Sequence, residues 1–357
     1  MASISRPVRW KAVATRFQAM NYDNLFLLGN GPIQLLNALE AANHFLDKGA
    51  LPSLVISNRK HRSPEAQQKL IDLREWGQVL WVEPESEIGM TRPPLRNLRM
   101  KHHTLRMHRL LRPYQGCRRF FLAQYTEFNR HLCAWLRPQE IIYLTDGMEI
   151  SRLFKKREKA LEIESTSSRE RLHNRLRWTF YGWDASHPDS MTIFSALRPQ
   201  LVKNDQFVKN DYSFICSQFG DKLEVRDAVA FIGQPHYPKS PHNGFCYPDY
   251  WQRIKQMEVT EYWPHPKEYE DEVTKQCKSL GIEVRTSPFP IEVAFLESGC
   301  PRTLVSVCST ALYTCKTVFG SLGVEAYYLE TGKELEEAWK HDRAFLRGAG
   351  VEAYEFA

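Results

Sequence analysis

The stretch VTEYWPHPKEYEDEVTKQCKSLG, residues 259–281, decides the fold because it holds one complete strand–turn–helix unit. Residues 259–263 predict a strand, which runs into a turn that contains two prolines. Pro266 fits the first helical position, where its missing N–H is not needed. Apolar residues then recur at helical spacing until Gly281, a residue type that often ends helices. They are Tyr269, Val273, Cys277 and Leu280.

The rest of the second half repeats this rhythm of strand and helix. Further strands are predicted at residues 228–232, 283–285, 303–308 and 324–329. A short helix is predicted after Pro290, closed by Gly299, and another over residues 311–319. Repeated βα units predict a parallel sheet, whose ligands bind outside the carboxyl ends of the strands. We therefore expect four scattered polar residues to meet at one edge of this sheet: His265, Glu292, Ser309 and Thr310.

The first half shows the same pattern with longer interruptions. Strands are predicted at residues 25–28, 54–56, 79–82, 141–144 and 191–196. Asp146 follows the fourth of them, and residues 198–210 are the expected linker. The sequence thus predicts an α/β fold with two Rossmann-like domains whose parallel sheets face each other across a cleft. The domains are expected at residues 1–210 and 211–334, and a C-terminal helix within 335–357 is expected to cross back to the first domain.

Length and composition agree with a two-domain globular protein. The chain has 357 residues, of which 43% are hydrophobic and 25% charged. No stretch approaches the roughly 20 apolar residues of a membrane-spanning helix, and residues 1–11 lack the apolar core of a signal peptide. We therefore expect a cytoplasmic protein. The eight cysteines show neither a C-x-x-C pair nor zinc-like spacing with a histidine, so we expect them to be small core residues.

Three short motifs stand at predicted strand ends: Thr145-Asp146-Gly147, His265-Pro266 and Ser309-Thr310. Their order resembles the Asp/Glu-Asp/Glu-Gly, His-Pro and Ser-Ser/Thr signatures of bacterial sialyltransferases. The blocks that look like glycosyltransferase family 52 and its polysialyltransferase relatives are residues 24–42, 141–149, 229–236, 259–268, 288–294 and 303–319. The chain departs from the family at Thr145, where a second acid is usual, so Asp146 is the sole carboxylate of its motif.

The resemblance implies the two-domain architecture called GT-B. It also implies inverting transfer of sialic acid from CMP-sialic acid to a sugar hydroxyl of a bacterial surface glycan, such as lipooligosaccharide, lipopolysaccharide or capsule. Asp146 matches the general base of the family, and His265 matches the group that hydrogen-bonds or protonates the leaving phosphate. Relatives in this family can form dimers, so the resemblance allows a homodimer.

The remaining site residues are also carried over from the resemblance. Ser309 and Thr310 match the phosphate hydroxyls, and Glu292 matches a carboxylate that binds the ribose. Gly233 and Gln234 would let the backbone approach the donor closely, and Pro266 completes the donor-binding set. Asn30 and Gly31 are candidates for contact with the acceptor or sialic acid.

We expect neither a metal nor a cofactor. Many sugar transferases hold a cation on a diphosphate through Asp-x-Asp, but no two aspartates stand two positions apart in this chain. A CMP-sugar has a single phosphate, so a helix dipole, hydroxyls and a histidine suffice to hold it.

Each motif also has a structural interpretation. Asp146 can form a turn or a helix cap, and His265 can pack between two prolines. Ser309-Thr310 can be a helix N-cap, and Glu292 an acid that complements a helix dipole. Two other functions stay open: a GT-B enzyme that uses CMP-Kdo or a UDP-sugar, and a non-catalytic protein that binds nucleic acid or anionic glycan. The net charge of +6 suggests the latter, but no nucleic-acid-binding module is visible, so nucleic acid is not an expected partner.

The region Arg92–Arg119 has the most uneven charge. It carries nine lysines and arginines, three histidines and no acidic residue, with leucines interspersed. Such a stretch is either a solvated helix face or a surface for an anionic partner, which relieves the repulsion between the cations. Leucines among cations suit a helix that lies on a membrane surface. We therefore expect peripheral association with anionic lipid, with an anionic acceptor as the alternative partner.

Overall fold

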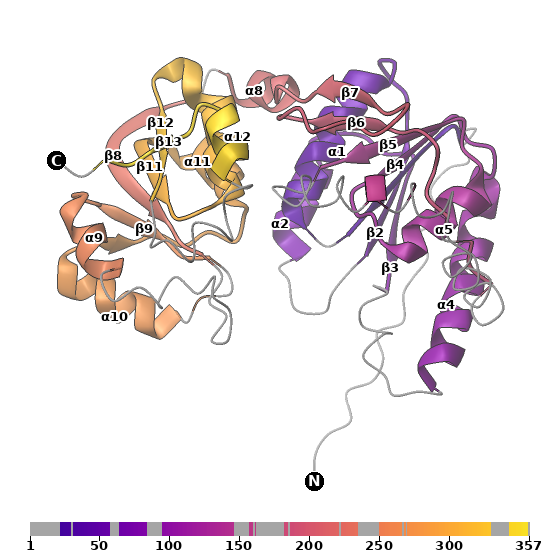
Figure 1. Cartoon of the computed structure of the whole chain (residues 1–357), viewed down its shortest axis with the longest axis horizontal. Helices are drawn as coiled ribbons and strands as arrows, with labels where there is room; N and C mark the ends of the chain where they lie inside the picture. Colours follow the sequence, from indigo (N-terminus) through magenta and orange to yellow (C-terminus); the bar gives the residue numbers. More distant parts are fainter. Residues whose placement is uncertain are drawn as a thin grey trace, which may run out of the picture.

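The chain folds into two lobes, each built around one parallel sheet (Figure 1). The computed structural model describes residues 22–29, 31–57, 64–83, 95–145, 157–159, 161, 182–184, 186–220, 223–234, 250–265, 268, 270–329 and 343–355. Among these residues, no helix combines the length and apolar character that crossing a membrane requires.

The first sheet has seven strands in the order β3-β2-β1-β4-β5-β6-β7, and every neighbouring pair is parallel. Its strands are β1 (Asn24–Leu28), β2 (Ser53–Ser57), β3 (Gln78–Val82), β4 (Arg119–Leu122), β5 (Glu140–Leu144), β6 (Thr192–Ser195) and β7 (Gln206–Lys209). The first six strands follow the doubly wound order 3-2-1-4-5-6 of Rossmann folds.

Helices cover both faces of the first sheet because its strands are apolar on both sides. They are α1 (Pro32–Phe45), α2 (Pro64–Ile71), α4 (Leu95–Leu111) and α5 (Glu127–Leu136), with the 3₁₀ turn η1 (Arg112–Tyr114) after α4. Phe26 and Leu28 of β1 join one buried cluster, and Leu25 and Leu27 join the other. Figure 1 shows α1 and α2 on one side of the sheet and α4 and α5 on the other.

The second sheet repeats this topology with six strands in the order β10-β9-β8-β11-β12-β13, all parallel. Its strands are β8 (Val225–Ile232), β9 (Glu261–Trp263), β10 (Glu283–Val284), β11 (Cys300–Ser306), β12 (Glu325–Tyr328) and β13 (Glu352–Ala353). Its helices are α9 (Tyr250–Gln256), α10 (Glu270–Leu280), α11 (Ile291–Ser298) and α12 (Thr310–Phe319), followed by the 3₁₀ turn η4 (Gly320–Leu322). Numbered from β8, this is again the order 3-2-1-4-5-6. The expected α/β class, with two Rossmann-like domains, is confirmed, and the GT-B type stays a prediction.

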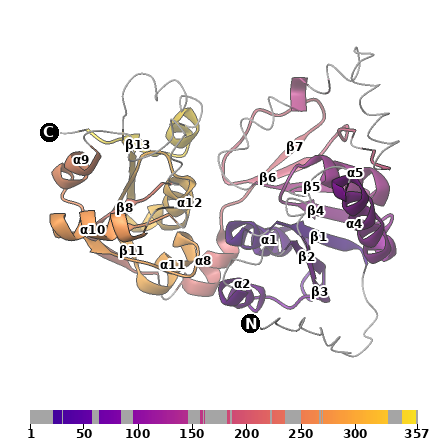
Figure 2. The same ribbon diagram turned by 90° about the horizontal axis from the view of Figure 1, so that it is seen from below.

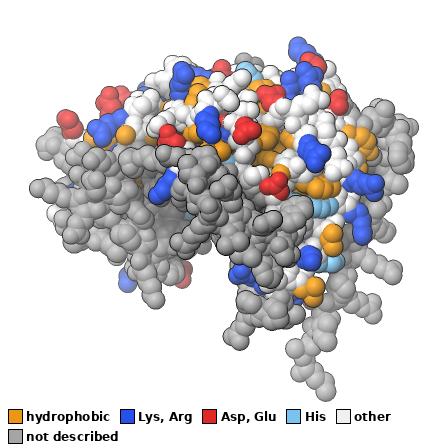
Figure 3. Space-filling model, turned by 45° about the vertical axis from the view of Figure 1, so that its right-hand side comes forward, with side chains coloured by type: hydrophobic (Ala, Val, Ile, Leu, Met, Phe, Trp, Pro, Cys, Tyr) orange, Lys and Arg blue, Asp and Glu red, His pale blue; other side chains and the backbone are white. Residues whose placement is uncertain are grey.

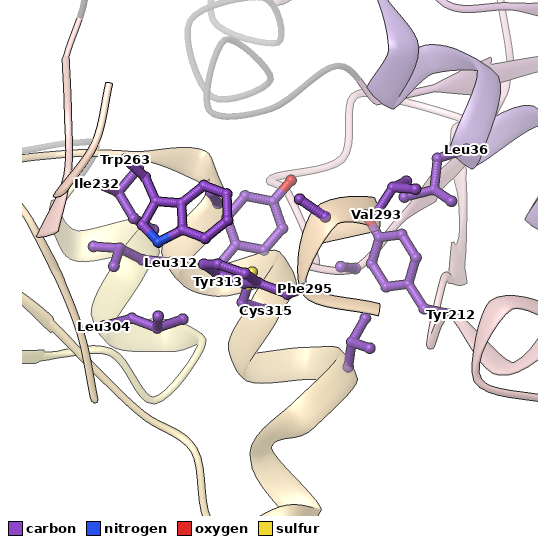
Figure 4. Close-up of a cluster of buried hydrophobic side chains, with 14 of the residues drawn as sticks. Leu36, Tyr212, Ile232, Trp263, Val293, Phe295, Leu304, Leu312, Tyr313 and Cys315 are labelled. Carbon is purple, nitrogen blue, oxygen red and sulfur yellow. The ribbon is translucent and has the colours of Figure 1, made fainter. Parts of the chain in front are cut away.

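The two lobes meet around helix α8 (Ser213–Phe219), which lies between them in both ribbon views (Figures 1 and 2). Glu40 of α1 accepts hydrogen bonds from the N–H groups of Phe214 and Ile215 at 3.0 and 2.8 Å. Burial raises the pKa of Glu40 to about 7, although these two bonds oppose the shift. Tyr212, just before α8, is buried in the same hydrophobic cluster as Leu36 of α1 and Val293 of α11 (Figure 4).

Three strands were not predicted, β4, β7 and β13, and the first two have polar ends. The expected linker at residues 198–210 contains β7, an edge strand whose Gln206 and Lys209 are exposed. The arginine-rich stretch ends in β4, whose first residue, Arg119, forms a salt bridge with Glu140 of β5 at 3.0 Å. The charge of Arg119, which made β4 hard to predict from the sequence, is thus paired with Glu140 on the neighbouring strand.

The end of the chain belongs to the second sheet through β13, which pairs with β12. Residues 343–348 form a helical turn, and Phe345 packs against both hydrophobic clusters. Residues 335–342 of the expected C-terminal helix lie outside the described residues. The domain limits at residues 210 and 334 stay predictions.

Candidate functional site

The candidate site lies at the carboxyl edge of the second sheet, where β8 is flanked by β9 and β11. Ile232, the last residue of β8, is in register with Trp263 of β9 and Ser306 of β11. The three strands therefore end at one level. The chain adds β9 and β10 on one side of β8, and then β11 to β13 on the other. The strand order thus reverses between β8 and β11, so this edge is the topological switch point at which doubly wound folds bind ligands.

Gln234 and Ser306 tie two of these strand ends together. The amide of Gln234 donates to the hydroxyl of Ser306 at 2.8 Å, and this hydroxyl donates to the carbonyl of Ile232 at 2.7 Å. Ser306 is fully buried, whereas Gln234 is half-buried. The side chain of Gln234 is thus fixed across the switch point, as a residue that lines a binding site must be.

Glu268 is the main site residue that sequence reasoning missed. Its carboxylate accepts hydrogen bonds from the N–H of His265 at 2.6 Å and the hydroxyl of Tyr262 at 2.8 Å, and also from the N–H of Gln234. Burial raises the pKa of Glu268 to about 7, against the opposing effect of these three donors. One carboxyl group therefore holds the loops that follow β8 and β9.

The sequence did contain a signal for Glu268. The N–H of Glu268 donates to the carbonyl of His265 at 2.9 Å while its side chain reaches back to the N–H of His265. The side chain of Glu268 thus reaches back over three residues, as the acid of a capping box does, but its N–H bonds the backbone carbonyl of His265 rather than a side chain, and α10 begins later, at Glu270. Pro266 lies between them, outside the described residues. A glutamate three positions after His265 and two after Pro266, the proline assigned to the first helical position, was the available clue.

Gly233 is needed for the approach of this carboxylate. A Cβ atom at position 233 would overlap the carboxylate of Glu268. We expected the backbone of Gly233 to lie close to a donor. In this structure it lies close to the carboxylate of Glu268. A donor contact of Gly233 stays a prediction.

Ser309 and Thr310 start helix α12 next to this edge. The hydroxyl of Ser309 accepts a hydrogen bond from the N–H of Ala311 at 3.3 Å, so Ser309 is the N-cap. Both residues are half-buried. The N-terminus of α12 therefore combines two hydroxyls with the positive end of a helix dipole, a combination suited to an anion.

Glu292 lies in the first turn of α11 but turns away from solvent. Its side chain is 6% exposed, and its carboxylate accepts a hydrogen bond from the hydroxyl of Thr314 of α12 at 2.7 Å. Burial raises the pKa of Glu292. The structure thus uses Glu292 to join α11 to α12, and its predicted contact with a ribose would require a rearrangement of this buried pair.

The end of β5 in the first sheet is held by buried polar side chains. Asp146 lies outside the described residues, but Thr145 before it is 3% exposed. The hydroxyl of Thr145 donates to that of Ser195 at 3.1 Å, and its carbonyl accepts from the side-chain amide of Asn37 at 2.6 Å. A second acid at position 145 would be desolvated here, which gives the departure from the motif a physical reason.

The other expected contacts of the first domain are only partly described. Asn30 lies outside the described residues, and Gly31 is the N-cap of α1, followed by Pro32 at the first helical position. Gly31 follows β1, which is the switch-point strand of the first sheet together with β4. Within the described ranges, no group of three histidine, cysteine, aspartate or glutamate side chains is placed to hold a metal ion.

Solved structures with a similar arrangement cover most of the chain. MurG from Acinetobacter baumannii matches with 11% identity, a TM-score of 0.45, and coverage of 93% of this chain and 85% of that one. A UDP-glucosyltransferase from Polygonum tinctorium matches with 10% identity, a TM-score of 0.48, and coverage of 92% and 84%. The E. coli heptosyltransferase WaaC matches with 10% identity, a TM-score of 0.38, and coverage of 90% and 99%.

Similarities with such low identities and TM-scores do not indicate an activity or a donor. No model of a known protein family matches the sequence, and a search of the curated proteins finds no match either.

Proposed function

We propose that this chain is an inverting sialyltransferase that moves sialic acid from CMP-sialic acid to a sugar hydroxyl of a bacterial surface glycan. The observation that carries the proposal is the common level at which β8, β9 and β11 end. Gln234, His265 and the pair Ser309-Thr310 follow these three strand ends. The fold thus gathers at one switch point two of the motifs that resemble sialyltransferase signatures.

A single phosphate suits the polar groups at this edge. The N-terminus of α12 offers two hydroxyls and the positive end of the helix dipole to an anion, as phosphate sites in other α/β folds do. His265 follows β9, and Gln234 follows the intervening strand β8. Because the carboxyl group of Glu292 is buried, the proposal does not depend on its contact with the ribose.

In the proposed reaction, the acceptor oxygen forms a bond to the anomeric carbon of sialic acid as the bond from this carbon to the phosphate oxygen breaks. Asp146 takes the proton of the acceptor hydroxyl, since a carboxylate is ionised at neutral pH. His265 donates a hydrogen bond or a proton to the departing phosphate. The products are the sialylated glycan and CMP, and the attack from the opposite face inverts the anomeric carbon.

The test is release of CMP from CMP-sialic acid in the presence of galactoside and sialoside acceptors, with CMP-Kdo and UDP-sugars as competing donors. Asp146→Asn should lower turnover by on the order of 10² or more while CMP binding stays nearly intact. Asp271→Asn, an exposed position on α10, is the matched control. His265→Ala should weaken turnover more than binding, whereas changing both Ser309 and Thr310 to Ala should also weaken CMP affinity.

Several outcomes would contradict the proposal. Release of UDP or of CMP from CMP-Kdo alone would assign another donor to the same edge. Near-normal turnover of Asp146→Asn would remove the proposed base. Activity should survive EDTA, so loss in chelator with recovery in magnesium or manganese would contradict a metal-free site. Binding of polynucleotide that does not compete with CMP, without turnover of any donor, would favour a non-catalytic protein.

A further inference from the structure

Helix α4 exposes two large apolar side chains on one face. Leu98 is 67% exposed and Leu105 is 61% exposed, more than any other large hydrophobic residue in the described ranges. They are seven residues apart, which is about two helical turns, so they lie one above the other. Isolated exposed leucines are ordinary, but two aligned leucines form a ridge.

The opposite face of α4 is firmly packed, so this exposure does not come from a loose helix. Met100, Met107 and Leu111 are buried in the cluster on that side of the first sheet. Thr104, also buried, accepts a hydrogen bond from the indole N–H of Trp183 at 2.8 Å. The packed face fixes the rotation of the helix and thereby keeps Leu98 and Leu105 pointing outward.

Exposed cations surround the leucine ridge. At 100° per residue, Lys101 falls on one side of the ridge, and Arg99, Arg106 and Arg109 fall on the other. None of these four cations takes part in a salt bridge between described residues. In Figure 3, blue and orange side chains alternate down the lower right of the molecule, where this side comes forward.

The cationic surface is narrower than the sequence suggested. Arg119 belongs to β4, where it pairs with Glu140 and donates to the carbonyl of Phe45 at 2.9 Å. Arg92 lies outside the described residues. Among the exposed residues that remain, those around the leucine ridge are called here the α4 face: Leu98, Arg99, Lys101, His102, Leu105, Arg106 and Arg109.

We propose that the α4 face docks on an anionic lipid surface. Its cations would lie at the level of the lipid phosphates, and Leu98 and Leu105 would enter the boundary of the acyl chains. Arg106 and Arg109, three residues apart on the helix, repel each other, and anionic headgroups offset this repulsion. The two leucines favour lipid over an anionic glycan, because a glycan offers little apolar surface to cover them.

The test is flotation of the full-length chain with vesicles of phosphatidylcholine, alone or with about one third phosphatidylglycerol. Changing Arg99, Lys101, Arg106 and Arg109 to Gln should weaken binding to the anionic vesicles by on the order of 10³-fold. A control with the same loss of charge elsewhere should bind like the parent. It changes four exposed lysines to Gln: Lys48, Lys255, Lys275 and Lys278.

A second variant separates lipid from other anionic partners. Changing Leu98 and Leu105 to Ser should weaken vesicle binding by roughly tenfold or more but leave binding to a soluble polyanion unchanged. High salt should weaken the binding of the parent by screening its cations. No substrate is present in either assay, so the result does not depend on the proposed transferase activity.

Two outcomes would overturn the proposal. If the four-Gln variant and the parent bind anionic vesicles equally, the α4 face does not dock there. If the Leu→Ser variant keeps full vesicle affinity while the four-Gln variant loses both vesicle and polyanion binding, the face is a general anion surface that suits an acidic glycan. Thermal unfolding of each variant establishes that it is folded before its binding is compared.

Discussion

Protonation of Glu268 should control the loops that hold Gln234 and His265, and Glu268→Gln isolates this effect. The carboxylate accepts from two backbone N–H groups and from the hydroxyl of Tyr262. A neutral glutamine keeps one acceptor oxygen but presents an NH₂ group to the other donors. It therefore imitates the protonated acid, which also has a hydrogen on one oxygen.

The expected loss of turnover follows from the hydrogen bonds that Glu268→Gln removes. A hydrogen bond to a charged acceptor contributes about 1.5–3 kcal/mol, so losing one costs roughly 10- to 10²-fold in any step that needs the ordered loops. Because burial raises the pKa of Glu268 to about 7, the parent should lose turnover as pH falls through this value. The Gln variant should turn over slowly at high pH and show little of this dependence. We expect kcat to respond more than KM.

The stability of the fold should respond with the opposite sign. A carboxyl group whose pKa is raised on folding stabilises the protein fully below its unfolded pKa, and this stabilisation is lost as pH rises through the folded value. The free energy of unfolding of the parent should therefore fall relative to Glu268→Gln between pH 4.5 and about 7. The ionised carboxylate of Glu268 thus orders the two loops, although the burial of its charge lowers the stability of the fold.

The assay is steady-state release of CMP from the donor across this pH range, with urea unfolding at the same pH values. Glu224→Gln, an exposed acid before β8, is the control for a loss of one charge. The reasoning is refuted if Glu268→Gln follows the pH profile of the parent, or if the stability difference between the two is independent of pH.

Two further predictions concern stability. Asp205→Ala should destabilise the fold by about 3–5 kcal/mol in urea unfolding, because it strands the buried charge of Arg157, whose guanidinium bonds Asp205 at 2.8 Å. Changing both residues to apolar ones should restore most of this loss, and an equal loss in the double variant would contradict the explanation. His131 accepts from the N–H of Asp184 at 3.0 Å, and burial lowers its pKa to about 4. Stability from this histidine is present above pH 6.5 and is lost as pH falls toward 4, so His131→Gln should flatten the fall in thermal midpoint over this window; an unchanged slope would contradict the assignment.

All strands of the second sheet except β13 could be predicted from the sequence because turn residues bracket them. Gly281 and Gly299 end their helices with φ of 72° and 84°, a conformation that glycine adopts at little cost. The first sheet was harder, since its strands are separated by longer interruptions. β4 and β7 begin with Arg119 and Gln206, and only their neighbours in the sheet show why these polar residues belong to strands.

The candidate site was predictable in position but not in its internal bonds. Strand ends and their order placed His265, Ser309 and Thr310 at one edge, which the register of the strands agrees with. The sequence could not show that the carboxyl group of Glu292 faces Thr314 rather than solvent. A position in the first turn of a helix fixes the backbone of a residue but not the direction of its side chain. Nor could it show that the carboxylate of Glu268 accepts hydrogen bonds from the loops that follow β8 and β9.

The junction between the lobes has a buried amide chain that reaches the end of β5. Asn37 donates to the carbonyl of Thr145, the amide of Asn210 donates to Asn37 at 3.2 Å, and Asn210 accepts from the N–H of Tyr212 at 3.1 Å. Tyr212 in turn packs in the cluster that contains Val293 of α11 (Figure 4). Fully paired buried amides permit few alternative arrangements, because each broken bond leaves a desolvated polar group. The end of β5 is therefore linked to the helices of the second lobe through side chains as well as through the linker. Under the proposed function, with the base in one lobe and the donor in the other, this junction would help to set the distance between them.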